Sequence, residues 1–223
     1  MTVTLITGGS SGIGEATARR LLDRGHRVVV TGRDEDRLAR VAKELDVLTV
    51  AGDTTDYESV TAAVDTALNA YGRLDNVVAN AGFATHDTLA DGDPERWRGM
   101  LLTNVLGPAY AVRAALPALR ESRGRVVLVG SVAGVKNTPG NIYSVTKWAV
   151  TALAENTRML VTGWGIGVTL IAPGRVDTPF WPGPVSGPAL SADDIAGTID
   201  WALGQPPEVD LNTVVVRPKG QAV

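Results

Sequence analysis

Residues 3–25, VTLITGGSSGIGEATARRLLDRG, decide the fold that we predict for this chain. An apolar run at 3–6 leads directly into a glycine-rich turn, and a helical segment begins at about residue 13. Between a strand and a helix, glycines permit a tight turn and let a pyrophosphate approach the N–H groups of the helix N-terminus. The stretch therefore predicts a first βα unit that binds a dinucleotide.

The same alternation continues to the end of the chain. Further short runs rich in β-branched residues lie at 27–31, 47–50, 75–79, 125–129, 167–171 and 213–217. Helical segments separate them at 35–45, 56–71, about 94–121 (a longer pair), 141–162 and 192–203. Apolar runs without polar alternation are typical of strands buried on both faces. We predict a doubly wound α/β fold, a parallel seven-stranded sheet flanked by helices (a Rossmann fold), and a single domain over 1–223.

Composition narrows the classes of function. The chain has 223 residues, a net charge of -3 with mixed signs, and no cysteine. We therefore expect no nucleic acid or membrane as a partner, no disulfides and no thiolate catalysis. His26 and His86 lack the spacing of metal ligands, so no metal is expected. No signal peptide and no run of about 18 apolar residues is present, and we expect a cytoplasmic protein.

The glycine cluster partly matches a second class of nucleotide site, the P-loop. Gly9 and Gly14 have half the spacing of a P-loop, but Glu-Ala follows at 15–16 where Lys-Ser/Thr is needed. This disfavours nucleoside triphosphate hydrolysis. The spacing of Gly8, Gly12 and Gly14 also differs from the common G-x-G-x-x-G, so the strand–turn–helix context carries the dinucleotide prediction.

The end of the second predicted strand indicates which dinucleotide is bound. An NAD-selective site offers a carboxylate there to the ribose 2′-hydroxyl. Here Gly32 is followed by Arg33, whose guanidinium matches a phosphate. We therefore expect NADP(H). The alternative is a solvated arginine in a charged turn, and the neighbouring Asp34 keeps it open.

Seven motifs in order give the chain a family resemblance. They are TGGSSGIG at 7–14, Asp53-Thr54, ANAG at 79–82, Asn104 in LLTNVLG, Ser131 in VVLVGSVAG, YSVTK at 143–147 and PGRVDT at 173–178. With these motifs the chain resembles the short-chain dehydrogenase/reductases of the compact, single-domain type, over essentially its whole length. The ending LNTVVVRPKGQ more weakly resembles the branch of NADP-dependent serine/3-hydroxy acid dehydrogenases and clavulanic-acid-type aldehyde reductases.

The resemblance implies an oxidoreductase that moves a hydride between nicotinamide and a carbonyl or alcohol. Tyr143 would be the general acid/base, and Lys147, one helical turn on, would favour its phenolate and bind the nicotinamide ribose. Lowering a tyrosine pKa from about 10 by about three units corresponds to about 4 kcal/mol. Ser131 would orient the substrate oxygen, and Asn104 would hold a water as part of a proton relay.

The resemblance also implies a cofactor site. Asp53 would meet the adenine, Asn80 the adenosine ribose or the adjoining strand, and Thr178 the carboxamide. As alternatives, Asp53 and Asn80 are turn formers, Asn104 is a helix-bending polar residue, and Ser131 is a strand-end cap. The full expected cofactor set is Thr7, Gly8, Ser10, Ser11, Gly12, Ile13, Gly14, Arg33, Asp53, Thr54, Asn80, Ala81, Gly82, Tyr143, Lys147, Pro173, Gly174, Val176 and Thr178.

The substrate side departs from the family pattern. The interval from Ser131 to Tyr143 is 12 residues, one shorter than close relatives would have, which predicts a reshaped loop. Residues 179–190 form a short substrate loop or a tolerated surface loop. Phe180 and Trp181 within it could line an apolar pocket, whereas Lys136 could meet an anionic group or simply be solvated.

Two other functions compete with a small-molecule carbonyl/alcohol oxidoreductase. A non-catalytic NADP(H)-binding regulatory protein could use the same scaffold, although it would have no reason to keep Ser131, Tyr143 and Lys147. Sugar-nucleotide epimerases share the tyrosine–lysine pair, but the 45 residues after Thr178 are too few for their substrate domain. The resemblance further implies a homodimer or homotetramer formed through the helices near 94–121 and 141–162.

Overall fold

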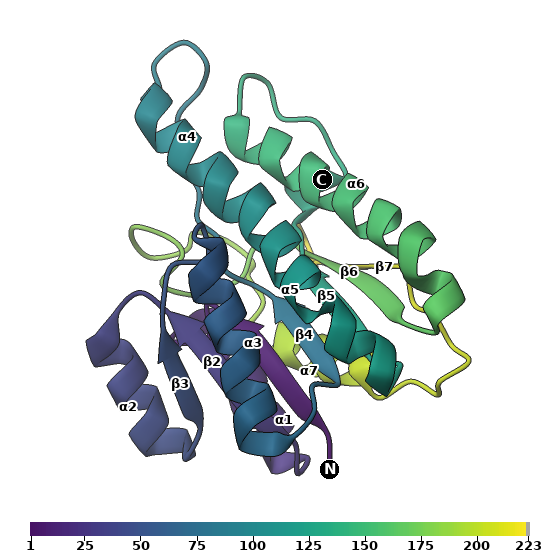
Figure 1. The fold of residues 1–223 in the computed structure, drawn as a ribbon. Helices are drawn as coiled ribbons and strands as arrows, with labels where there is room; N and C mark the ends of the chain where they lie inside the picture. Colours follow the sequence, from purple (N-terminus) through teal and green to yellow (C-terminus); the bar gives the residue numbers. More distant parts are fainter. Residues whose placement is uncertain (222–223) are drawn as a thin grey trace.

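The computed structural model describes residues 1–221 and contains a parallel sheet between two layers of helices (Figure 1). Its seven strands run in the order β3-β2-β1-β4-β5-β6-β7, and each adjacent pair is parallel. The strands are β1 (Val3–Thr7), β2 (Arg27–Gly32), β3 (Leu48–Ala51), β4 (Asn76–Ala79), β5 (Arg125–Val129), β6 (Gly167–Pro173) and β7 (Thr213–Val216). The predicted doubly wound seven-stranded fold is confirmed.

The helices also follow the predicted order. They are α1 (Gly12–Asp23), α2 (Glu35–Leu45), α3 (Tyr57–Tyr71), α4 (Pro94–Leu101), α5 (Gly107–Ser122), α6 (Ile142–Val161) and α7 (Ala192–Leu203). Short side chains begin several of them: Asp34, Asp56, Asp93 and Asn141 each accept a hydrogen bond from a first-turn N–H group. The predicted pair over 94–121 is one run, because a π-helical turn, η1 (Leu102–Leu106), joins α4 to α5.

Successive residues of a strand point to opposite faces, and both faces of this sheet are buried. In β1, Leu5 packs with α3, α5 and α6, whereas Ile6 packs with α1, α2 and α7. Figure 1 shows α3, α5 and α6 in front of the sheet and α1 and α7 behind it. Each fully buried side chain of this kind contributes about 1.5–3 kcal/mol. Because both faces of the sheet are buried, the strands consist largely of consecutive apolar residues.

The strand order reverses between β1 and β4, which places a crevice at their carboxyl ends. Thr7 and Ala79 are partners in the register of these two strands, so the loops that follow them begin side by side. Crevices at such reversal points are where open α/β sheets bind ligands. In the part of the chain that the structure describes, no helix is both long and apolar enough to span a membrane.

Candidate active site

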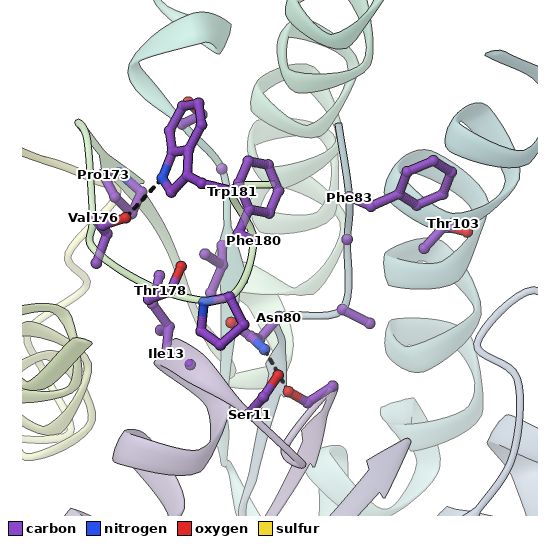
Figure 2. A pocket seen from close by; sticks show the side chains of 18 of the residues that line it. Ser11, Ile13, Asn80, Phe83, Thr103, Pro173, Val176, Thr178, Phe180 and Trp181 are labelled. Atoms are coloured by element: carbon purple, nitrogen blue, oxygen red, sulfur yellow. Dashed lines mark hydrogen bonds between the residues drawn. The ribbon is translucent and has the colours of Figure 1, made fainter. Parts of the chain in front are cut away.

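A cleft of about 720 Å³ lies at the carboxyl ends of the strands, and Figure 2 shows residues that line it. Most of the expected site residues line it: Gly8, Ser10, Ser11, Gly12, Ile13, Arg33, Thr54, Asn80, Ala81, Gly82, Ser131, Tyr143, Lys147, Pro173, Gly174, Val176 and Thr178. Thr7, Gly14, Asp53 and Asn104 do not. The cleft is also lined by residues that the sequence analysis did not single out, among them Arg37, Phe83, Thr103, Val129 and Gln221.

The glycine-rich turn has no space for side chains. Gly8 and Gly12 have φ angles of +67° and +56°, a region that L residues with side chains rarely adopt. A Cβ atom on Gly14 would collide with the carbonyl oxygen of Gly8 and the amide of Asn80. Gly14 therefore lets the glycine-rich turn pack closely against Asn80, although it does not itself line the cleft.

Asn80 and Thr7 hold this turn against β4. The Asn80 Nδ2 atom donates to the carbonyl oxygens of Thr7 and Gly8 at 3.1 and 3.0 Å. The Thr7 Oγ1 atom accepts from the backbone N–H groups of Asn80 and Ala81 at 3.1 and 3.2 Å. Asn80 thus makes the expected contact with the adjoining strand, and its contact with the adenosine ribose stays a prediction. Thr7 supports the glycine-rich turn in the same way, through its hydrogen bonds with the Asn80 and Ala81 N–H groups.

The cleft residues fit a dinucleotide on two further observations. Ser11 occupies the N-cap position of α1 but makes no side-chain cap hydrogen bond, so the helix end presents free N–H groups and its positive dipole to the cleft. The Thr54 Oγ1 atom is buried and has no hydrogen-bond partner within the described structure. A buried hydroxyl without a partner is costly, and a bound polar ligand would satisfy it.

Two arginines stand where β2 reaches the cleft. Arg33 Nη1 lies 3.8 Å from Asp53 Oδ2, and Arg37 Nε lies 3.0 Å from Asp34 Oδ2. Both arginine side chains are more than half exposed, so these pairs leave most of their N–H donors facing solvent. Arg37 could have been found from its position one helical turn after Arg33, on the same side of the first turn of α2.

Asp53 makes local contacts rather than lining the cleft. Its Oδ1 atom accepts from the Thr55 N–H group at 2.8 Å, as expected of the turn-forming alternative. The adenine contact implied for Asp53 stays a prediction. Among residues 1–221, no group of three or more histidine or acidic side chains is arranged to hold a metal ion.

Tyr143, Lys147 and Ser131 meet at the other end of the cleft. Tyr143 and Lys147 lie one turn apart on α6, and the Lys147 Nζ atom is 5.7 Å from the centre of the tyrosine ring. Ser131 follows β5 and caps the short helix η2 (Val132–Gly134), its Oγ atom accepting from the Ala133 N–H group at 3.1 Å. The helical spacing that suggested the pair does place both residues on one face.

Burial shifts the pKa values of both Tyr143 and Lys147. Burial raises the pKa of Tyr143 to about 12, and a polar interaction with the Ser131 side chain opposes this rise only in part. Burial also lowers the pKa of Lys147 to about 8. Both shifts have one cause, desolvation, which penalises the charged form of each group. The lowering of the tyrosine pKa that the resemblance implies for Lys147 stays a prediction.

Asn104 occupies the π-helical turn and contacts the chain after β4. Its Oδ1 atom accepts from the Phe83 N–H group at 3.0 Å, and its Nδ2 atom donates to the Phe83 carbonyl at 2.8 Å and to Thr146 Oγ1 at 3.1 Å. Both amide hydrogens are thus used. A Cβ atom on Gly82 would lie 3.1 Å from Asn104 Oδ1 and 3.8 Å from Lys147 Nζ. The proton relay implied for Asn104 stays a prediction.

Aromatic side chains line the substrate side. The rings of Phe180 and Tyr143 are 5.8 Å apart, and the rings of Phe180 and Trp181 are 5.5 Å apart. Figure 2 shows Phe83 beside Thr103, across the cleft from Phe180. The loop at 179–190 thus contributes side chains to the cleft at its first residues.

Comparison with known proteins places the chain in a family. The family model for short chain dehydrogenase matches residues 2–184. An uncharacterized oxidoreductase of Staphylococcus saprophyticus is 37% identical over 226 residues, which cover 97% of each chain.

Two solved structures are similar over the whole chain. One is an alcohol dehydrogenase from the archaeon Thermococcus sibiricus complexed with 5-hydroxy-NADP, with a TM-score of 0.91, 30% identity and coverage of 100% of this chain and 99% of the other. The other is serine dehydrogenase from Escherichia coli, with a TM-score of 0.90, 29% identity and full coverage of both chains.

Fold, motifs and relatives agree on the class: the protein is an oxidoreductase. It belongs to the short-chain dehydrogenase family, of the compact type, and the likeness to serine dehydrogenase accords with the weaker resemblance of its C-terminal residues.

Proposed function

We propose that this protein is an NADP(H)-dependent oxidoreductase that interconverts a small carbonyl compound and the corresponding alcohol. The observation that carries the proposal is the convergence of Tyr143, Ser131 and Lys147 on one end of a cleft whose other end holds Arg33 and Arg37. A non-catalytic NADP(H)-binding protein would not require Tyr143, Ser131 and Lys147, and no observation favours this alternative.

The bound nicotinamide would supply or accept the hydride, and the chain would handle the proton and the substrate oxygen. In the reduction direction, the Tyr143 hydroxyl donates its proton to that oxygen. A pKa of about 12 keeps this proton in place at neutral pH. The Ser131 hydroxyl donates a hydrogen bond to the same oxygen and stabilises its developing charge. In the oxidation direction, Tyr143 accepts the proton, and the nearby Lys147 ammonium group favours the resulting phenolate.

The preference for NADP(H) over NAD(H) is supported by the residues at the end of β2. Gly32 offers no carboxylate to a ribose hydroxyl, and a Cβ atom there would come within 2.9 Å of Ser10 Oγ. Arg33 and Arg37 both line this part of the cleft. Guanidinium groups bind phosphates with paired N–H donors, so a 2′-phosphate is the group that this end would select. The similar archaeal alcohol dehydrogenase is complexed with an NADP derivative.

A panel of carbonyls and alcohols, followed by nicotinamide absorbance with both cofactors, tests the proposal. We expect turnover with NADPH or NADP, and a loss of at least about a hundredfold in kcat for Tyr143→Phe, as is usual for a general acid/base. NADPH binding should persist in that variant. Tyr143→Phe with unaltered turnover would refute the proposed chemistry, and NADPH binding without any turnover would favour the regulatory alternative.

We further propose that the protein forms a homodimer or homotetramer. Large apolar side chains are exposed on helices that contact each other: Leu101 and Leu106 at the two ends of the π turn, and Val145, Met159 and Leu160 on α6. Covering such a surface is favourable, and a second copy would present the same residues. Light scattering that finds only monomer would refute this. The single domain over 1–223 and the cytoplasmic location stay predictions.

A further inference from the structure

The segment Phe180–Trp181 forms an aromatic wall directly beside the proposed proton donor. The Phe180 ring lies 5.8 Å from the Tyr143 ring at an interplanar angle of 57°, and the Trp181 ring extends the wall edge-on at 5.5 Å. Figure 2 shows both side chains on the same side of the cleft, above Thr178. A substrate whose oxygen meets Tyr143 would therefore place the group next to its carbonyl against Phe180.

Trp181 is held in this position from two sides. Its Nε1–H group donates to the Val176 carbonyl oxygen at 2.8 Å. The His86 ring, from the loop after β4, stacks on it with centres 5.2 Å apart and planes 15° from parallel. A wall fixed before the ligand arrives costs little ordering entropy on binding.

The base of the loop is tied as well. Leu190 bridges to Val176, accepts a hydrogen bond from the Asp177 N–H group at 2.8 Å, and donates to the Arg175 carbonyl at 2.9 Å. The two ends of the 177–190 segment therefore stay together. This favours a preformed aromatic surface rather than one assembled by the substrate.

The two cationic side chains near this wall each donate a hydrogen bond to a main-chain oxygen. Lys147 donates to the Val129 carbonyl at 2.9 Å, and Arg175 Nη1 donates to the Ser186 carbonyl at 2.5 Å, back within the loop. The remaining side chains that line this end are uncharged: Phe83, Val132, Ala133, Thr138 and Asn141. Burying a carboxylate against Phe180 would leave it without a partner, which is costly.

We propose that the substrate carries an uncharged apolar group, an aromatic ring or branched alkyl chain, next to the reacting carbonyl, and that Phe180 and Trp181 bind it. This inference rests on the proposed function of Tyr143. It distinguishes this protein from the similar structure named serine dehydrogenase, because a carboxylate close to the reacting carbon would fall on the aromatic wall.

Substrate pairs that present either a carboxylate or its neutral ethyl ester test the inference. Ethyl benzoylformate is compared with benzoylformate, and ethyl acetoacetate with acetoacetate, at saturating NADPH. We expect kcat/KM for each ester to exceed that of its acid by at least about a hundredfold, because the acid must bury an unpaired charge. Within the esters, the phenyl compound should be preferred by about tenfold or more.

Three variants assign the effect to the wall. Trp181→Ala should lower kcat/KM for ethyl benzoylformate about ten- to hundredfold, mainly through KM, while the Kd for NADPH stays unchanged. Trp201→Ala removes an exposed tryptophan of α7 and is the matched control, with no expected change. Arg175→Gln should leave the ester-to-acid ratio as it is.

The outcomes separate the inference from the function beneath it. Acids turned over as well as their esters, acid turnover lost in Arg175→Gln, or an unaffected Trp181→Ala would each overturn the inference and leave the oxidoreductase proposal standing. If no carbonyl or alcohol in either form were turned over by protein that binds NADPH, both proposals would fall.

Discussion

The ammonium group of Lys147 donates a hydrogen bond to the main-chain oxygen of Val129 at 2.9 Å, at the point where β5 ends. The lysine side chain is buried, and a neutral carbonyl does not fully replace the water that it loses. This is why burial lowers its pKa to about 8. The contact joins α6 to the sheet and sets the cation close to the Tyr143 ring.

The buried lysine should make stability depend on pH. Between pH 8 and 9.5 the unfolded lysine keeps its proton while the folded one loses it, so the free energy of unfolding of the wild type should rise with pH. The rise should be about 2 kcal/mol over this range, and Lys147→Met should lack it. Urea unfolding of both proteins at several pH values measures the difference. If the free energy of unfolding changed with pH equally in the wild type and in Lys147→Met, the prediction would be contradicted. The raised pKa of Tyr143 acts in the opposite sense only above about pH 10.

The two arginines at the end of β2 should decide cofactor preference. Arg33→Ala and Arg37→Ala should each weaken NADPH binding about tenfold or more, since a charge-assisted hydrogen bond contributes about 1.5–3 kcal/mol. NADH binding should be unchanged, because NADH lacks the 2′-phosphate. Fluorescence titration with both nucleotides measures this. Arg98→Ala, on the exposed surface of α4, is the control. An equal loss of affinity for NADH and NADPH would show that the arginines do not bind the 2′-phosphate.

Gly14 should be irreplaceable in the turn after β1. Gly14→Ala forces a Cβ atom onto the Gly8 carbonyl oxygen, so the turn must shift and NADPH binding should be lost. Gly163→Ala is a matched control, because no atom lies within 4 Å of its added Cβ. Calorimetric titration with NADPH, together with the melting temperature of each variant, separates lost binding from lost folding. Unchanged NADPH affinity in Gly14→Ala would show that the glycine-rich turn can accommodate a side chain at this position.

Asn104 should matter for stability through its contacts with Phe83. Asn104→Ala removes the partner of the partly buried Phe83 N–H and carbonyl groups, and an unpaired buried polar group costs about 1–3 kcal/mol. We expect a loss of at least about 2 kcal/mol in the free energy of unfolding. Asn212→Ala, at an exposed site, should change little. Equal stability of the two variants would show that the Phe83 contacts are weak.

The fold was predictable because its pattern is local. Each strand is buried on both faces, so every strand appears as an apolar run, and residues such as Asp93 and Asn141 mark where helices begin. The π turn at Leu102–Leu106 was not predictable, since π-helical hydrogen bonds leave no periodic signal in the sequence. Arg37 was not singled out, although its position one helical turn after Arg33 was available, because only the structure shows that the first turn of α2 borders the cleft.

The sequence by itself determined the order of strands and helices, the glycine cradle and the helical spacing of Tyr143 and Lys147, because these depend on residues near one another in the chain. Only the tertiary structure decided what surrounds that pair. Burial by several distant segments, with Phe180 packed against the tyrosine, raises one pKa and lowers the other. Desolvation is the sum of contacts from the whole fold, and no short stretch of sequence contains it.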